Sequence, residues 1–416
     1  MLSPGKRLAG VALFSVAALA GLRLRYLYAG VAPDLRHPAL PLMTVPYGRR
    51  TLPFLRLAYR FASRPGPGAG AAWHDIGGSG TLRAQVVTPV RTGTDRPGVL
   101  WLHAGGMIAG SPQIETALAA ELARDLDAVV VAPAYRLAPE HPFPAQLDDA
   151  MTALYWLRAN AAGLGVDAGR VAVVGASAGG GLTALVAQRA YDEGVQLRAQ
   201  AMIYPMLDDR TALRDRNRRR GRLVWTASSN RFAWSAYEGE RMQGEVPRYF
   251  SAARRGELGG LAPAWIGVGD LDLFYEENVD YARRLERAGV QTTLHTVQGM
   301  YHAADGLRAG ADSMRAFTAD MVQHLRRHLE GLASTPGTYQ PGRDALQPGS
   351  DACVQAAGVR RAVVSCAPGD YFVAECPDFL DRCLGRGRPS GPPGRALGPA
   401  ARPGSASRGI RPASGL

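Results

Sequence analysis

The chain has 416 residues, a hydrophobic fraction of 46% and a formal net charge of +12. This length suits one large α/β domain of about 250–300 residues with appendages, and the composition allows a full core. The positive charge does not indicate nucleic-acid binding. The stretch with the most closely spaced basic residues, 214–222, contains arginines without interleaved aromatic residues. The four cysteines lie within 353–383 in no Cys-x-x-Cys pair, which argues against a zinc site and leaves the main body without a disulfide.

The N-terminal region begins with an apolar stretch over residues 8–22, which follows Lys6 and Arg7. The stretch is shorter than the roughly 20 residues of a membrane-spanning helix. It fits either a signal-peptide core or an uncleaved apolar helix that packs on the domain or touches a membrane surface, and we favour the helix. We therefore expect a cytoplasmic protein, with membrane association or export through this segment as the alternatives.

The composition divides the chain into three parts. Residues 1–70 form an apolar N-terminal segment and cap, in which Leu52–Ala62 is predicted to be one helix before a Pro/Gly run at 65–68. Residues 71–332 form the main domain. Residues 333–416 are rich in Pro, Gly and Arg and are predicted to be disordered.

Within the main domain, strand-like and helix-like segments alternate. The predicted strands are Gly98–Leu102, Ala128–Val131, Val171–Val174, Ala199–Tyr204, Ala264–Val268 and Thr292–Val297. The predicted helices are Glu115–Asp127, Leu147–Ala159, Gly180–Tyr191, Asn278–Ala288 and Ser313–Leu329. Apolar strands separated by helices of this length predict a mostly parallel central sheet covered by helices on both faces.

One segment, Asp208–Arg248, interrupts this alternation. It is rich in arginine and then in aromatic residues. Two interpretations stay open: a surface insertion with its own small apolar patch, or part of a lid whose aromatic side chains line a ligand pocket.

The most informative motif is the run Gly-Ala-Ser-Ala-Gly at 175–179, which directly follows an apolar strand and precedes further glycines. A strand, a turn too tight for large side chains and a helix together make a nucleophile elbow. Such a turn exposes the Ser177 hydroxyl at the sheet edge, and the helix N-terminus behind it favours developing negative charge. The context therefore predicts an acyl-transferring serine hydrolase.

A serine nucleophile needs a base and a carboxylate, which in this fold follow in the chain order serine, acid, histidine. Asp272 comes just after the strand that ends at Val268, and His302 comes just after the strand that ends at Val297. Asp270 is the nearest rival for the acid, and we expect it to bond locally. His324 and His328 have a metal-ligand spacing but no evident third ligand, so an exposed helix face is preferred.

Backbone N–H groups are expected to hold the oxyanion. Ala178 supplies one of them, and Gly105 and Gly106 of the run His-Ala-Gly-Gly at 103–106 supply two more. Glycine suits this loop because the backbone must approach the substrate oxygen closely.

Four stretches together resemble the hormone-sensitive-lipase-like esterases, the bacterial family IV carboxylesterases of the α/β-hydrolase superfamily. Besides the elbow, they are Tyr-Arg-Leu-Ala-Pro-Glu-His-Pro-Phe-Pro-Ala at 135–145, His-Ala-Gly-Gly-Met at 103–107, and Gly-Asp-Leu-Asp-Leu-Phe-Tyr-Glu-Glu at 269–277. The resemblance covers roughly residues 70–330 and implies an α/β-hydrolase fold with an N-terminal helical cap. It implies Ser177 as nucleophile, His302 as base and Asp272 as its orienting acid.

The same resemblance implies an oxyanion hole made by the amides of Gly105, Gly106 and Ala178. Ala104 departs from the family, which usually has glycine there, and a positive φ at Ala104 would strain the loop.

The expected function is hydrolysis of short-to-medium acyl esters by a carboxylesterase through an acyl-enzyme intermediate, without metal or cofactor. The partner is a small-molecule ester and not a nucleic acid, with membrane-surface contact through residues 8–22 as a further option and the oligomeric state left open. One alternative is a catalytically silent ligand-binding relative, against which the presence of His302 argues. Another is amide or lactone hydrolysis on the same machinery.

Overall fold

The computed structural model describes residues 21–62, 70–77, 82–89, 93–213, 219–240 and 244–331, together with the backbone of 363–365 and 371–373. The chain divides into two compact units, residues 1–335 and residues 336–416. The predicted apolar stretch at 8–22 lies outside the described residues except for its last two positions, so membrane contact through it stays a prediction.

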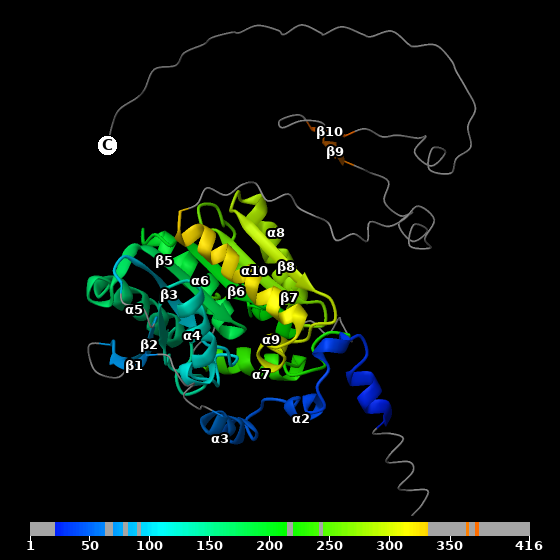
Figure 1. Ribbon diagram of the computed structural model, residues 1–416. Coiled ribbons are helices and arrows are strands. Elements are labelled where there is room, and N and C mark those ends of the chain that lie inside the picture. Colours follow the sequence, from blue (N-terminus) through cyan, green and yellow to red (C-terminus); the bar gives the residue numbers. More distant parts are fainter. Residues whose placement is uncertain are drawn as a thin grey trace, which may run out of the picture. The chain divides into compact units, whose positions relative to one another are not determined.

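The described part of the first unit contains an eight-stranded sheet in the order β1-β2-β4-β3-β5-β6-β7-β8 (Figure 1). Its strands are β1 Gly70–Asp75, β2 Arg83–Thr88, β3 Arg96–Leu102, β4 Val129–Pro133, β5 Val166–Ala176, β6 Ala199–Ile203, β7 Ala264–Gly269 and β8 Thr292–Val297. The pairs β1–β2 and β2–β4 are antiparallel, and all the other neighbours are parallel. The predicted mostly parallel sheet is confirmed.

Helices cover both faces of this sheet, and alternate residues of the central strands show it. Leu100 of β3 and Val173 of β5 belong to one hydrophobic cluster, which also contains side chains of α5 Ala145–Ala159, α6 Ala178–Asp192 and α8 Tyr275–Arg287. Trp101 and Val174, one position further on, belong to a second cluster with α4 Thr116–Asp125 and α10 Asp312–Leu329. Because successive side chains of a strand point to opposite faces, the two clusters are the two sides of the sheet.

The remaining helices and 3₁₀ turns lie before the sheet or in the connections between the strands and helices described above. They are α2 Leu40–Met43, α3 Leu52–Ala62, α7 Ala227–Glu238, α9 Ala304–Leu307 and the 3₁₀ turns Pro33–Leu35, Pro112–Glu115, Ala162–Leu164, Asp209–Leu213 and Ala252–Arg254. Helix α7 lies inside the aromatic-rich insertion and is capped by Thr226, whose hydroxyl accepts a hydrogen bond from the Ser229 N–H.

The N-terminal cap consists of a helical stretch over residues 21–27, one 3₁₀ turn, α2 and α3. Helix α3 has the bounds predicted from the sequence, Leu52–Ala62. Among the residues that the structure describes, no helix is both long and apolar enough to cross a bilayer. In the second unit, β9 Val363–Ser365 and β10 Tyr371–Val373 form one antiparallel pair, and the other residues of the segment predicted to be disordered lie outside the described part.

Candidate active site

Ser177 stands at the turn between β5 and α6 with φ 56° and ψ −117°. Its N–H donates to the Ile203 carbonyl at 2.8 Å, which fixes the turn against the neighbouring strand. The turn is possible because Gly179 has no side chain: a Cβ there would lie 1.9 Å from the Leu102 carbonyl oxygen. Ser177 therefore has the strained backbone conformation that the predicted elbow requires. The packing around the turn holds the residue in this conformation despite the strain.

Three of the predicted residues meet at this turn. Ser177 Oγ lies 2.9 Å from His302 Nε2, and His302 Nδ1 lies 2.7 Å from Asp272 Oδ2. All three are buried, with exposed fractions of 2%, 5% and 1% for Ser177, His302 and Asp272. Both contacts are satisfied by the tautomer in which His302 donates from Nδ1 to Asp272 and accepts at Nε2 from the Ser177 hydroxyl.

The two candidate acids occupy different places in the loop after β7. Asp272 Oδ1 accepts from the Phe274 N–H at 2.9 Å, which holds its carboxylate toward His302. Asp270 Oδ1 accepts instead from the Gly299 N–H at 2.6 Å, so this side chain does not bond within its own loop as expected but ties it to the loop that leads to His302. The geometry brings Asp272 and not Asp270 to the histidine.

Aromatic rings surround the His302 imidazole. Tyr204, Phe274 and Trp225 have ring centroids 4.6, 5.4 and 6.1 Å from it. Trp225 comes from the insertion whose role the sequence left open, whereas Trp234 and Tyr237 of α7 pack on Phe250, away from the histidine. The insertion therefore contributes one ring to the site and a separate apolar patch.

The loop after β3 carries the predicted oxyanion donors. Gly105 and Gly106 have φ values of 132° and 64°, and Met107 has 63°, whereas Ala104 is absent from the residues with positive φ. The departure at Ala104 therefore does not strain the loop. Gly106 is required for another reason, because a Cβ there would lie 2.4 Å from the Trp225 ring. Within the described residues, the N–H groups of Gly105 and Gly106 have no protein acceptor.

Two side chains hold the start of this loop. Glu115 Oε1 accepts from the Ala104 N–H at 3.0 Å, and Oε2 accepts from Trp101 Nε1 at 2.7 Å. His103 stacks on Tyr135 at 4.0 Å, and burial lowers the pKa of His103 to about 4, so its neutral ring donates from Nδ1 to the Ala104 carbonyl at 2.8 Å. Glu115 was not predicted from the sequence, because a single glutamate ahead of a helix gives no signal of this contact.

Burial raises the pKa of Glu115 to about 7, with Asp305 adding to the rise and the hydrogen bonds from Ala104 and Trp101 opposing it. Since the unfolded chain releases this proton near its ordinary value of 4.5, the folded state binds more protons between these values. We therefore expect the free energy of unfolding to fall by about 1–3 kcal/mol, relative to Glu115→Gln, as the pH rises from 4.5 through 7. Urea denaturation of both proteins across this range measures the difference, and parallel pH curves would contradict it.

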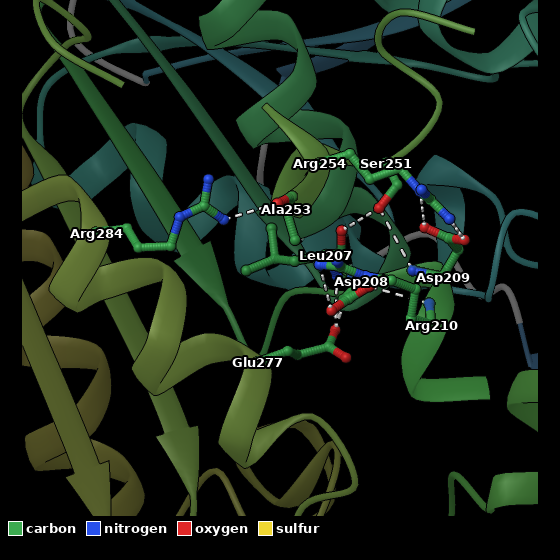
Figure 2. Close-up of polar contacts among 9 residues, drawn as sticks. All are labelled: Leu207, Asp208, Asp209, Arg210, Ser251, Ala253, Arg254, Glu277 and Arg284. Carbon is green, nitrogen blue, oxygen red and sulfur yellow. Dashed lines mark hydrogen bonds and ion pairs between the residues drawn. The ribbon is translucent and has the colours of Figure 1, made fainter. Parts of the chain in front are cut away.

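A network of polar contacts supports the loop that follows β6 (Figure 2). The buried Glu277 of α8 accepts from the Leu207 N–H at 2.7 Å, and the Leu207 carbonyl accepts from the Ser251 hydroxyl at 2.7 Å. One residue earlier, the Met206 N–H donates to the Ser177 carbonyl at 2.9 Å. Burial holds the pKa of Glu277 well above its usual range. Helix α8, which follows Asp272 in the chain, is thus tied to the turn that carries Ser177.

The remaining histidines lie elsewhere. His295 Nδ1 lies 2.8 Å from Asp320 Oδ2, and the rings of His324 and His328 are 4.6 Å apart on α10. The expected exposed helix face is wrong for this pair, because His324 is buried and His328 is half-buried. In the described part of the chain, no group of three or more His, Cys, Asp or Glu side chains is placed to hold a metal ion. Ala178, the third predicted oxyanion donor, is the buried first residue of α6.

Comparison with known proteins gives consistent matches. A family model described as alpha/beta hydrolase fold matches residues 99–305. Esterase LipI of Mycobacterium tuberculosis is 34% identical over 49% of this chain and 64% of its own length. Ethyl acetate hydrolase of Pseudomonas putida is 35% identical, again over 49% and 64%. The chain therefore matches slightly less than two thirds of these two relatives.

A solved structure titled bacterial heroin esterase matches a larger share of both chains than these two relatives do. It superposes with a TM-score of 0.66 and 31% sequence identity, over 73% of this chain and 99% of its own. The region that the family model matches, residues 99–305, contains Ser177, Asp272 and His302.

Proposed function

Because the chain belongs to the hormone-sensitive-lipase-like branch of the α/β-hydrolase superfamily, we propose that it is a serine carboxylesterase that acts on short-to-medium acyl esters. The observation that carries the proposal is the continuous line of hydrogen bonds from Ser177 through His302 to Asp272, with distances of 2.9 and 2.7 Å. Relatives named for ester hydrolysis, such as the ethyl acetate hydrolase, support the substrate class.

In the first step, Ser177 Oγ attacks the ester carbonyl carbon while His302 Nε2 takes the hydroxyl proton. Asp272 accepts from Nδ1 and stabilises the imidazolium that forms. The carbonyl oxygen becomes an oxyanion, which the N–H groups of Gly105, Gly106 and Ala178 stabilise. His302 then gives its proton to the leaving alcohol as the C–O bond breaks, and an acyl-serine remains.

In the second step, His302 takes a proton from a water molecule that attacks the acyl-serine carbonyl. The tetrahedral intermediate collapses, the proton returns to Ser177 Oγ and the carboxylic acid leaves. The Trp225 ring, which lies against Gly106 and near His302, is proposed to form one wall of the substrate pocket.

The direct test is covalent labelling with a fluorophosphonate, combined with turnover of p-nitrophenyl acetate, butyrate, octanoate and palmitate. We expect one phosphonyl adduct per chain, mapped by peptide mass spectrometry to Ser177, and faster turnover of the shorter esters. Prior acylation by a slow ester substrate should protect Ser177 from the label.

Other outcomes of the labelling experiment discriminate among functions. A folded protein with neither adduct nor turnover would support a silent ligand-binding relative. Labelling at Ser177 together with hydrolysis of amides or lactones but not of esters would keep the machinery and change the substrate class.

A further inference from the structure

The cap carries an unusual concentration of exposed apolar side chains. Of the twelve large apolar side chains that are exposed in the described residues, nine lie within 22–61. Three of them belong to α3: Phe54, Leu57 and Phe61, with exposed fractions of 74%, 47% and 76%. The spacing i, i+3, i+7 places these three on one side of the helix, which we call the outer face of α3. Leu42 of the preceding α2 is exposed to 79%.

The opposite side of α3 is already packed on the main domain. Leu52 is buried with an exposed fraction of 5%. Arg56 donates from Nε to the Ile108 carbonyl at 2.8 Å and pairs with Glu140 at 2.7 Å. The Tyr59 hydroxyl lies 2.6 Å from that of Tyr47. Since these contacts fix the rotation of the helix, the outer face cannot turn inward. The side toward the main domain is held largely by polar contacts, so the main apolar face of the amphipathic helix α3 is the exposed one, which calls for a further partner.

The charges around the outer face indicate what that partner is. Residues 21–62 contain seven arginines and one acidic residue, Asp34. Arg49 and Arg50 lie just before α3, with Thr51 between them and the helix, and Arg60 lies in its last turn. All three are exposed and have no hydrogen bond or ion pair with the described residues. A second copy of the chain would bring these positive charges against each other, which disfavours self-association.

From this arrangement we propose that the outer face of α3 docks the protein on an anionic lipid surface. Phe54, Leu57 and Phe61 enter the headgroup region, while Arg49, Arg50 and Arg60 pair with lipid phosphates, as in interfacial amphipathic helices. The inference goes beyond the proposed esterase activity and does not depend on it. Because Arg56 on the same helix binds the Ile108 carbonyl, just after the glycine loop, docking places the candidate site close to the lipid surface.

The docking test is co-sedimentation of the full chain with vesicles of phosphatidylcholine alone or mixed with phosphatidylglycerol. We expect binding to the mixed vesicles that weakens with added salt, since exposed charges are screened. The double variant Phe54→Gln/Phe61→Gln should lower the vesicle partition coefficient at least about tenfold, because two large apolar side chains no longer enter the interface. Arg49→Gln/Arg50→Gln should reduce the preference for the mixed vesicles.

Matched controls separate docking from general effects. Leu213→Gln removes an apolar side chain that is 82% exposed but lies outside the cap, and it should bind vesicles like the wild type. Phe54→Gln/Phe61→Gln should keep the wild-type midpoint of thermal unfolding, which shows that it is folded whether or not the protein hydrolyses esters. Ser177→Ala should bind vesicles unchanged, which makes the result independent of hydrolysis.

Three results would overturn the docking proposal. The wild type could fail to bind the mixed vesicles. The double variant at Phe54 and Phe61 could bind as tightly as the wild type, which would shift the contact to residues 8–22. Sedimentation equilibrium could reveal a wild-type dimer that this variant dissociates, without any vesicle binding.

Discussion

Replacing Ser177 with alanine is expected to lower kcat for p-nitrophenyl butyrate about 10⁶-fold, to a residual rate that the oxyanion donors alone sustain. The expected loss is this large because the nucleophile is absent and no acyl-enzyme can form. Stability should change little, since within the described residues the Ser177 hydroxyl hydrogen-bonds only to His302 and alanine keeps the Cβ of the turn. Steady-state kinetics with thermal unfolding of the same samples measures both quantities.

Because Ser177 and His302 act in the same chemical step, the losses of kcat caused by replacing each of them should not add. His302→Ala is expected to cost about as much as Ser177→Ala, and the double variant no more than either, because each change removes the same step. Turnover of Ser177→Ala within about tenfold of the wild type would contradict the proposed nucleophile. Additive losses would show instead that Ser177 and His302 act separately.

The central sheet could be predicted because parallel strands that are buried on both faces have continuous apolar sequences. The bounds of β8, Thr292–Val297, agree with the sequence prediction. The two strands that were missed, β1 and β2, form the antiparallel edge of the sheet. β1 is mostly exposed, so packing imposes no apolar pattern on it, and its sequence gives no strand signal.

Helix starts were harder to predict than helix cores. α6 begins at Ala178 and not at Gly180, since the nucleophile turn runs directly into the helix through glycines that carry no periodicity. α7 was missed altogether, because its aromatic side chains pack on residues outside the helix, such as Phe143, which precedes Tyr237 by 94 positions. Propensity and pattern within a short window cannot report such contacts.

The residues of the candidate site also divide into those that the sequence predicted and those that it did not. Chain order and the motif around each residue predicted Ser177, Asp272 and His302, and the structure places His302 within hydrogen-bonding distance of both other residues. The groups that hold them were not found. Glu115 reaches Ala104 across 11 positions of the chain, and Tyr204 contacts the His302 ring across 98. The first contact depends on how the connection between β3 and α4 folds back on itself, and the second on the packing of two connections at the sheet edge, neither of which a motif encodes.

The second large effect concerns the acid, where Asp272→Asn is expected to lower kcat about 10⁴-fold. In the present geometry Asp272 accepts two hydrogen bonds, from His302 Nδ1 on Oδ2 and from the Phe274 N–H on Oδ1. Asparagine has only one carbonyl oxygen for these two donors. If that oxygen keeps the Phe274 bond, the amide NH₂ faces His302 and favours the tautomer protonated at Nε2, which cannot take the Ser177 proton.

Asp270→Asn is the matched control, because it makes the same chemical change two residues away in the same loop. Asp270 accepts one hydrogen bond, from the Gly299 N–H at 2.6 Å, and an asparagine oxygen can accept it as well. We therefore expect kcat to stay within about tenfold of the wild type, with a modest loss of stability since a charge-assisted hydrogen bond becomes neutral. The pair isolates the tautomer effect from any general loosening of the loop. A greater loss of kcat at Asp270 than at Asp272 would exchange the two assignments and make the contact between Asp272 and His302 a structural one.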